Sequence, residues 1–512
     1  MAFEKNNFNV ARKTKLEKKE FVVECNVSAG ANINKILTTS VVANIETKEV
    51  LNGVINFSGV IDTKIIFLGE EDEINNANAT CPFTSRSESE EIQNGQTAVV
   101  FVKVVDYNVE SIGENARITV TLEQSGYLIS NQEIDTIACN DDSVCQKNEE
   151  IDVVKYIGSA EDEFVVESEI NIRENIKKML LTESQVVLKS VESGVNFVTV
   201  TGDVVSRVLY LSENDKFESG YVYESFKQEI ELIGATRDSH VEGEAMALQG
   251  KVEIELAQDE KGGKVLVKVP VRACVRAFDK ETISVISDLY STKGEINTTT
   301  SSFSMTEVCK LELVEGKIEG SLILDDNHPR VDKLLFSGGN SVTITNSYIK
   351  DGEVFVEGIA KTMVVYLNDE TSSLHSVVLD VPFALNDKIS CHEDGMISVE
   401  AIVCDVDVVV KKGREFYYDA KVKASVNCCH DLVSGVISDA VVIEENKTKD
   451  YAMEIVFAPK GKQLWDIAKS VRVKEEQILA QNPDVVFPCE QDTPLVLFEQ
   501  RLRWWYRFKL NI

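Results

Sequence analysis

Three long segments of the chain repeat one another. They are VINFSGVIDTKIIFLGE from Val54, NFVTVTGDVVSRVLYLSE from Asn196 and EVFVEGIAKTMVVYLND from Glu353. In each segment a glycine precedes an aromatic residue by eight positions, and leucine follows; the pairs are Gly59 and Phe67, Gly202 and Tyr210, Gly358 and Tyr366. The glycines are 143 and 156 residues apart, far beyond the period of about 20 to 50 residues that stacked repeats have. The pattern predicts three duplicated domains.

Two further landmarks keep the same register. A leucine lies 22, 22 and 23 residues before the glycine, and a phenylalanine lies 24, 24 and 25 residues after it. The leucines are Leu37, Leu180 and Leu335, and the phenylalanines are Phe83, Phe226 and Phe383. Four landmarks in register three times indicate duplication rather than chance.

The repeated segments have the pattern of β-strands. Residues 354–366 alternate between two sets of side chains rich in β-branched and aromatic residues, which is the period of a strand. A glycine within a strand usually marks a bulge or a close approach of another group. We therefore predict a mainly β chain of three antiparallel β-sandwich or barrel-like domains. Residues 223–235, YESFKQEIELIGA, fit a helix or a strand equally well.

The expected domain boundaries follow from the repeats and from composition. We place the three β domains at residues 1–150, 151–302 and 303–447, a small α+β domain at 448–500 and a tail at 501–512. The first joint, within CNDDSVCQKNEEIDVVKYIGSAEDE, is acidic, and the second lies in STKGEINTTTSSFSMTE. Both have the composition of linkers between domains.

The charge of the chain excludes some partners. Its 512 residues carry a formal net charge of −32, and such a surface repels phosphate backbones and anionic lipid, so we expect no nucleic-acid partner. The first twenty residues lack the apolar core of a secretory signal, and no apolar run reaches the roughly 18 residues of a membrane span. We expect a cytoplasmic protein whose eleven cysteines are reduced.

The sequence offers little for catalysis. It contains no GxxxxGK[ST], GxGxxG, GxSxG or HExxH motif, and its five histidines leave little capacity for general-base chemistry. One cluster contains residue types that can ligate zinc: Cys391, His392, Cys428 and His430. Its spacing matches no standard zinc motif, and Cys428 and Cys429 would point to opposite faces of a strand. We expect no enzyme activity, no cofactor and no metal.

The C-terminal residues have a different pattern. MEIVFAP from Met453 is apolar and extended, and after the turn at Lys460 and Gly461 apolar residues recur at helical spacing. A second helix ends at NPD, and TPLVLFEQ from Thr493 returns as a strand. With LWDIA and QILAQNP in place, this strand, helix, helix, strand pattern resembles the LysM domain. In that family the loop before the first helix and the segment around Asn-Pro form a groove for N-acetylglucosamine polymers.

The loop departs from the family at two positions. LysM domains usually have Asp and Thr between the glycine and the leucine, whereas this chain has Lys462 and Gln463. The loop therefore lacks polar groups that the family uses for sugar, and also a side chain that would cap the helix. By residue match, the resemblance implies a partner-binding surface formed by Gly461, Leu464, Trp465, Ile467, Ala468, Asn482 and Pro483, with Lys462 and Gln463 as this chain's own variations. Trp465 is either a half-packed edge of the module or an anchor for a protein partner.

The last twelve residues, RLRWWYRFKLNI, carry four positive charges and no negative one. Two interpretations stay open. The tail extends a strand or folds back on the acidic body, or it makes a basic and aromatic contact with a membrane surface or an acidic partner.

Three such β repeats followed by one LysM resemble the LysM-containing spore-coat morphogenetic proteins of clostridial spore formers, whose repeats are SPOCS domains. The V-x-G-x-(V/I)-x-x-x-x-(V/L)-(Y/F)-L signature and the domain order carry this resemblance. It implies a non-enzymatic adaptor of the mother-cell cytoplasm, recruited to the forespore surface, whose LysM binds the coat-basement ATPase SpoIVA. The repeats would bind other coat proteins or self-associate. The alternative function is that of a peptidoglycan-binding cell-wall protein.

Overall fold

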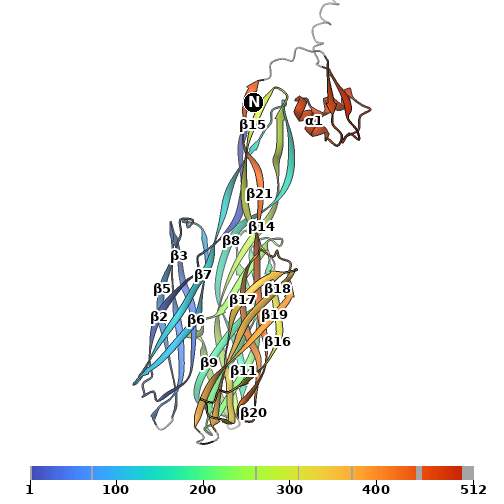
Figure 1. Cartoon of the computed structure of the whole chain (residues 1–512). Helices are drawn as coiled ribbons and strands as arrows, with labels where there is room; N and C mark the ends of the chain where they lie inside the picture. The colour runs from blue at the N-terminus through green and yellow to red at the C-terminus, as the bar shows by residue number, and fades with distance from the viewer. Residues whose placement is uncertain are drawn as a thin grey trace, which may run out of the picture.

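The computed structural model describes residues 3–70, 73–259, 262–308, 311–368, 370, 373–445 and 453–498. Almost all elements in this part of the chain are β-strands, which pair in antiparallel sheets. The prediction of a mainly β chain is confirmed. Figure 1 shows a broad body of sheets, a narrower stalk of long strands, and a small module with two helices beside the far end of the stalk.

The strands group into three units and a terminal module. Unit 1 comprises β1 (Glu4–Lys15), β2 (Lys19–Ser28), β3 (Lys35–Leu51), β4 (Val54–Leu68), β5 (Ile74–Glu88), β6 (Thr97–Ile112) and β7 (Asn115–Ala138). Unit 2 comprises β8 (Val144–Ile172), β9 (Ile176–Ser193), β10 (Phe197–Ser212), β11 (Phe217–Glu231), β12 (His240–Ala247), a 3-10 turn (Gln249–Lys251), β13 (Glu253–Asp259) and β14 (Gly262–Ser291). Unit 3 comprises β15 (Gly294–Val308), β16 (Glu312–Ile323), β17 (Val331–Lys350), β18 (Glu353–Asn368), β19 (Leu374–Lys388), β20 (Met396–Lys411) and β21 (Glu415–Glu445). The terminal module comprises β22 (Met453–Ala458), α1 (Leu464–Val471), α2 (Glu475–Gln481) and β23 (Thr493–Phe498).

One pairing pattern occurs in all three units. Each unit has a three-stranded sheet, with β4, β10 or β18 in the middle, and a second sheet built on its last strand, β7, β14 or β21. On one side this last strand pairs with the strands that open its unit: β7 with β1 and β2, β14 with β8, and β21 with β15 and β16. On the other side it pairs with the strands that precede it in the chain: β7 with β6, β14 with β12 and β13, and β21 with β20. Apolar side chains of the two sheets pack together and form the core of each unit.

The repeated glycine and phenylalanine are direct neighbours across two strands. Gly59 pairs with Phe83 between β4 and β5, and the other two units pair Gly202 with Phe226 and Gly358 with Phe383. A Cβ atom at Gly59 would lie 2.1 Å from the backbone oxygen of Asn44 and 2.6 Å from Cζ of Phe83. The phenylalanine ring therefore covers a position where only glycine fits. The same pairing places residues 223–231 in strand β11, which settles their open assignment as strand.

The repeated leucines lie at β-bulges. The register of β3, β9 and β17 skips Leu37, Leu180 and Leu335, each next to the partner of the repeated aromatic residue. A bulge adds one residue to a strand and re-aims its side chain. Leu37 and Leu180 thereby enter an apolar cluster shared by units 1 and 2, which also holds Ile66 and Leu209. The spacing of the landmarks thus reflects contacts within and between units.

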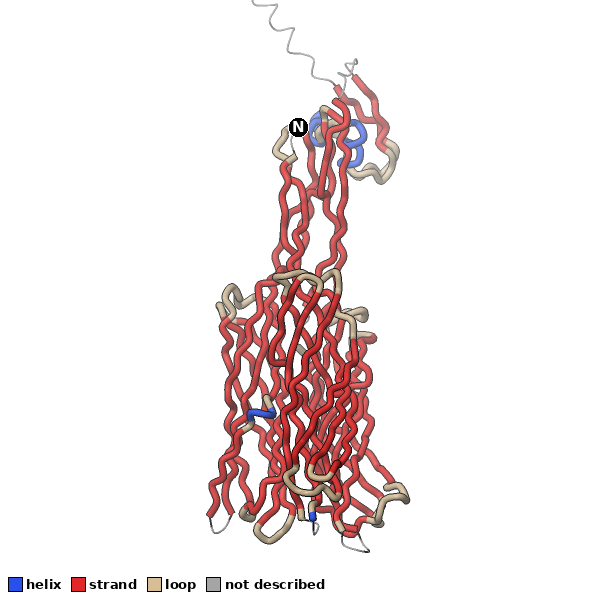
Figure 2. The backbone as a smooth tube through the Cα atoms, turned by 90° about the vertical axis from the view of Figure 1, so that its left-hand side faces the viewer, coloured by secondary structure: helices blue, strands red, loops and turns tan. Residues whose placement is uncertain are grey.

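The stalk consists of three strand pairs, one from each unit. They are β1 with β7, β8 with β14, and β15 with β21, which Figure 2 shows running upward from the body. β14 alone has 30 residues, about 100 Å of extended strand. The pairs pack on one another through an apolar core to which every strand contributes a residue: Val10, Ile134, Val153, Val285, Phe303 and Val436.

The joints that composition marked as linkers are strands of this stalk. The first lies largely in β8, which pairs with β14 from Val144 to Ile172, and the second lies in β15. The acidic residues of β8, such as Glu149 and Glu150, are exposed, whereas Val153 is buried. A strand with one solvent-exposed face resembles a linker in composition. The interpretation of these two segments as linkers is therefore corrected to strands.

A buried ionic cluster joins units 1 and 2. Lys13 of β1 pairs with Glu242 of β12, and their side chains are only 1% and 6% exposed. Glu242 also lies 3.5 Å from Arg276, which pairs with Glu244. The Lys13 ammonium lies over the ring of Tyr127, 4.8 Å from its centroid. Burial alone would raise the pKa of Glu242, but the charges of Lys13 and Arg276 hold it below the ordinary value.

Candidate partner-binding site

The terminal module is a two-stranded antiparallel sheet, β22 with β23, covered on one face by α1 and α2. Its core contains Ala458, Ile467, Ala468, Ile478, Cys489, Leu495 and Leu497, all buried. Two residues of the predicted site, Ile467 and Ala468, are therefore 4% and 0% exposed. Leu464 is half-buried against the same core. These three residues pack in or against the core of the module.

Asn482 holds the second helix to the returning strand. Its side chain is buried, its amide donates to the carbonyl oxygens of Ile478 and Val496, both at 3.0 Å, and its Oδ1 accepts from the backbone N–H of Val496 at 2.8 Å. All of these bonds are internal, so its role in this structure is architectural. The adjacent Pro483 is exposed.

The loop before α1 is exposed at Gly461, Lys462 and Gln463. Gly461 has φ of +81°, a region that favours glycine, and its N–H donates to the carbonyl of Cys489 at 2.8 Å. Gln463 is the N-cap of α1, and its side chain makes no capping hydrogen bond. The loop thus presents polar side chains to solvent and leaves the helix end without a side-chain acceptor.

Replacing Gln463 with threonine is expected to stabilise α1 by about 1 kcal/mol, because the hydroxyl can accept a backbone N–H of the first turn. Amide hydrogen exchange in the full chain is the measurement, and the α1 amides should exchange about five times more slowly, if they exchange by local opening. Gln463→Ala is the matched control and should give no such protection. Equal protection in both variants would contradict the capping argument.

Trp465 packs against the tip of the stalk. Its indole N–H donates to Oδ2 of Asp288 on β14 at 2.8 Å, and its ring meets the ring of Tyr290 edge to face at 5.0 Å between centroids. Lys469 pairs with the same carboxylate. The hydroxyl of Tyr290 donates to the carbonyl of Val473 at 2.8 Å. The half-buried tryptophan therefore faces unit 2, and it is engaged within the chain.

Two charged contacts strengthen this attachment. Burial would raise the pKa of Asp288, but hydrogen bonds from Lys469 and Trp465 hold it below the ordinary value. Arg472 lies 3.2 Å from Glu295 at the start of β15. Sequence reasoning missed Asp288, Tyr290 and Glu295, since a contact with a strand some 175 positions away leaves no local signal.

The other face of the module's sheet is apolar and exposed. Met453, Ile455 and Phe457 alternate along the outer side of β22 and are 52%, 54% and 70% exposed, and Phe498 of β23 is 50% exposed. Met453 pairs with Phe498, which places both on the same side. We call these four residues the outer face. The sequence contains a signal for it, because Met453, Ile455 and Phe457 make one side of this strand apolar while Val456 and Ala458 on the other side are apolar as well.

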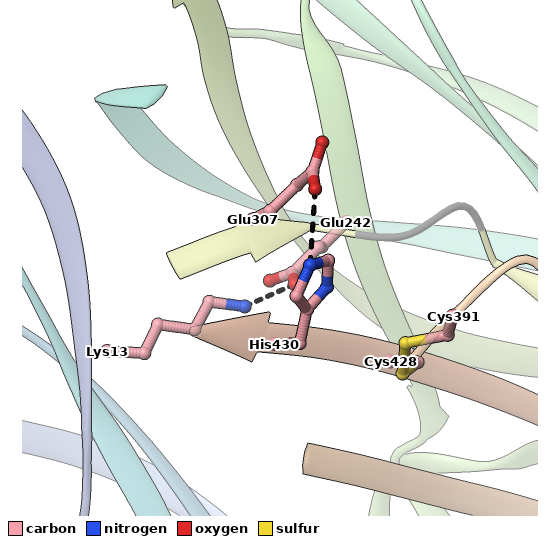
Figure 3. Close-up of a disulfide and its surroundings, with 6 residues drawn as sticks. All are labelled: Lys13, Glu242, Glu307, Cys391, Cys428 and His430. Carbon is pink, nitrogen blue, oxygen red and sulfur yellow. Dashed lines mark hydrogen bonds and ion pairs between the residues drawn. A yellow bond between two sulfur atoms is a disulfide. The ribbon is translucent and has the colours of Figure 1, made fainter. Parts of the chain in front are cut away.

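The structure brings together the residues weighed as a zinc site, but two of them form a disulfide. Cys391 and Cys428 are bonded, with Cα atoms 6.7 Å apart, as Figure 3 shows. The expectation that all cysteines are reduced is wrong for this pair. Cys391 lies in the turn before β20, and β20 pairs with β21 around Cys428, so residues 37 positions apart meet. In the described part of the chain, no three or more side chains of metal-binding type are placed to hold a metal ion together.

The basic tail at 501–512 lies outside the described residues, so both interpretations of it stay predictions. Within the described residues no helix has the length and apolarity needed to cross a membrane.

Comparison with known families identifies one part of the chain. Residues 32–112 match the family model described as SipL, SPOCS domain. The match covers β3 to β6 of unit 1, including Gly59 and Phe83. It supports a sporulation-related, SipL-type protein. Neither a curated protein nor a solved structure matches the chain.

Proposed function

We propose that this SipL-type chain is a non-enzymatic adaptor of spore-coat assembly. Its terminal module, a LysM-like domain, binds the SpoIVA-type coat ATPase and tethers the chain to the forespore surface from the mother-cell cytoplasm. The three units, which we take to be three SPOCS domains, bind other coat proteins or further copies of the chain. The observation that carries this proposal is the SPOCS match at residues 32–112, in a chain whose residues 453–498 form a small module beside the far end of a stalk.

The geometry of the module supports one surface as the proposed contact with the partner. Trp465 and Lys469 hold the module to Asp288 of the stalk. This attachment leaves the outer face and the loop Gly461–Gln463 exposed. An exposed cluster of large apolar residues, rimmed by polar ones, is typical of a surface that binds another protein. The proposed contact surface therefore combines the outer face with the altered loop.

The arrangement of the body supports tethering. The sheets of the broad body, which come from three units of one pairing pattern, lie at one end of the stalk, and a single terminal module lies at its other end. Several weak contacts made by one chain on a polymerised surface act together, and they can raise the overall affinity by orders of magnitude over that of a single contact.

Changing the outer face tests the proposed partner surface. In the full chain, Ile455→Ser combined with Phe457→Ser should weaken binding to the purified ATPase at least tenfold, since buried apolar anchors dominate protein interfaces. Biolayer interferometry measures this affinity. Ile323→Ser and Val433→Ser remove side chains that are 80% and 77% exposed in unit 3, and these matched controls should bind as the wild type does.

The same proteins separate the adaptor from the peptidoglycan-binding alternative. The adaptor proposal expects no calorimetric signal with chitooligosaccharide, because Lys462 and Gln463 replace the polar pair that LysM domains use. Binding of the sugar by the full chain, with none of the ATPase, would overturn the proposal in favour of the cell-wall function.

A further inference from the structure

A group of histidines and cysteines lies where unit 3 meets unit 2. An open cavity of about 730 Å³ there is lined by Cys391, His392, His430, His240 and Glu307, among other residues. The rings of His392 and His430 are in contact, with centroids 4.1 Å apart. Three of the five histidines of the chain therefore border one cavity, and one of the two bonded cysteines borders it with them.

His430 is buried, and the groups around it satisfy its two ring nitrogens only in part. It is 5% exposed, and within the described residues neither of its ring nitrogens makes a hydrogen bond. Its Nε2 lies 3.3 Å from the carboxylate of Glu307, which is itself paired with Lys280. Figure 3 shows the ring directed at that carboxylate. A buried ring nitrogen that lacks a hydrogen-bond partner is destabilising, so this side chain is suited to hold a ligand.

The backbone gathers four potential metal ligands around this point. Cys428 and His430 are two positions apart on β21, so their side chains share one face of the strand. Cys391 and His392 are adjacent in the turn before β20. The same turn folds closely over the sulfur atoms, because a Cβ at Gly395 would lie 2.9 Å from Sγ of Cys428 and 3.0 Å from Sγ of Cys391.

We infer that the reduced protein binds one zinc ion through Cys391, His392, Cys428 and His430. Two thiolates and two imidazoles are a common tetrahedral ligand set of structural zinc. The disulfide first takes up two electrons and two protons from a thiol reductant, which is oxidised to its own disulfide. The two thiols then lose their protons as zinc binds. The bonded and the zinc-bound states exclude each other, because the two sulfur atoms cannot be joined to each other and ligate zinc as thiolates at the same time. With the disulfide closed, the described residues form no group placed to hold a metal ion.

The bound ion would take over the connection that the disulfide makes. Both link the turn after β19 to strand β21. In a reducing compartment the disulfide would open, and the zinc ion would keep this part of unit 3 closed. This site is independent of the terminal module and of its partner.

Cobalt(II) and zinc titrations of the full chain test this inference. Protein that has been reduced, freed of reductant under argon and titrated with cobalt(II) should bind one ion per chain, with the visible bands of tetrahedral cobalt and the near-ultraviolet band of cobalt–thiolate bonds. Zinc should displace the cobalt and abolish both. The oxidised chain, with the Cys391–Cys428 bond verified by mass spectrometry, should show neither band.

Matched variants locate the site. Cys391→Ser should abolish the thiolate spectrum or weaken cobalt binding at least a hundredfold, and His392→Gln should weaken it at least tenfold. Cys274→Ser and His328→Gln change half-buried residues elsewhere and should bind as the wild type does; circular dichroism verifies that all four variants are folded. The inference is overturned if the reduced wild type takes up no stoichiometric metal, or if folded Cys391→Ser and His392→Gln both keep the wild-type spectrum and affinity.

Discussion

Gly59→Ala is expected to destabilise unit 1 by about 3 kcal/mol or more, because the added methyl group has no room between the strands. The new Cβ would lie 2.1 Å from the backbone oxygen of Asn44, which cannot rotate away, and 2.6 Å from the ring of Phe83. The strands must therefore separate or the ring must leave its place. Urea denaturation followed by circular dichroism measures the loss.

Gly158→Ala is the matched control for this change. Gly158 also lies within a strand, β8, but a Cβ there has no atom within 4 Å. We expect the control to leave stability unchanged or to raise it slightly, because alanine restricts the unfolded chain. If the two variants differed by less than 1 kcal/mol, the close approach of Phe83 and Asn44 would not be the reason for the repeated glycine.

Glu242→Gln is expected to cost about 3 to 5 kcal/mol, because it leaves Lys13 buried without a carboxylate partner. The side chain of Lys13 is 1% exposed, so water cannot take over the lost interaction. Since Lys13 belongs to unit 1 and Glu242 to unit 2, the loss falls on the contact between the units. Thermal unfolding by calorimetry should show a lower transition, or separate transitions for units that unfold together in the wild type.

Two further variants distinguish charge burial from simple packing. Glu169→Gln breaks an ion pair with Lys264 whose side chains are 57% and 55% exposed, and it should cost less than about 1 kcal/mol. Lys13→Met combined with Glu242→Leu removes both buried charges and should be less destabilising than Glu242→Gln alone. A double variant at least as unstable as Glu242→Gln would contradict the assignment of this loss to an unpaired buried charge.

The sequence predicted the elements whose signals are local. The alternation of two sets of side chains indicated the strands around Gly59, Gly202 and Gly358. The nearly constant spacing from these glycines to the repeated phenylalanines reflects pairs across neighbouring strands. The register of each hairpin fixes which residues pair, so the number of residues between the glycine and the phenylalanine is nearly the same in all three units. The strand, helix, helix, strand order of the terminal residues followed from periodicity in the same way.

The stalk and the contacts across it could not be predicted in this way. The acidic residues of β8 lie on the solvent-exposed side of a strand whose other side packs on two other strand pairs. Composition alone cannot distinguish such a strand from a linker. The partner of Trp465 is Asp288, which only the folded arrangement brings near. Likewise, nothing in the local sequence indicates that Cys391 bonds to Cys428, or that Asn482 ties α2 to β23.

Fluorescence microscopy of the tagged full chain in sporulating cells tests most directly the proposal that the terminal module tethers this chain to the forespore. We expect a ring of signal around the forespore that becomes diffuse in the mother cell when Ile455 and Phe457 are changed to serine, and that persists in the Ile323→Ser control. Signal in the cell wall, or a ring that the double variant leaves unchanged, would contradict the account.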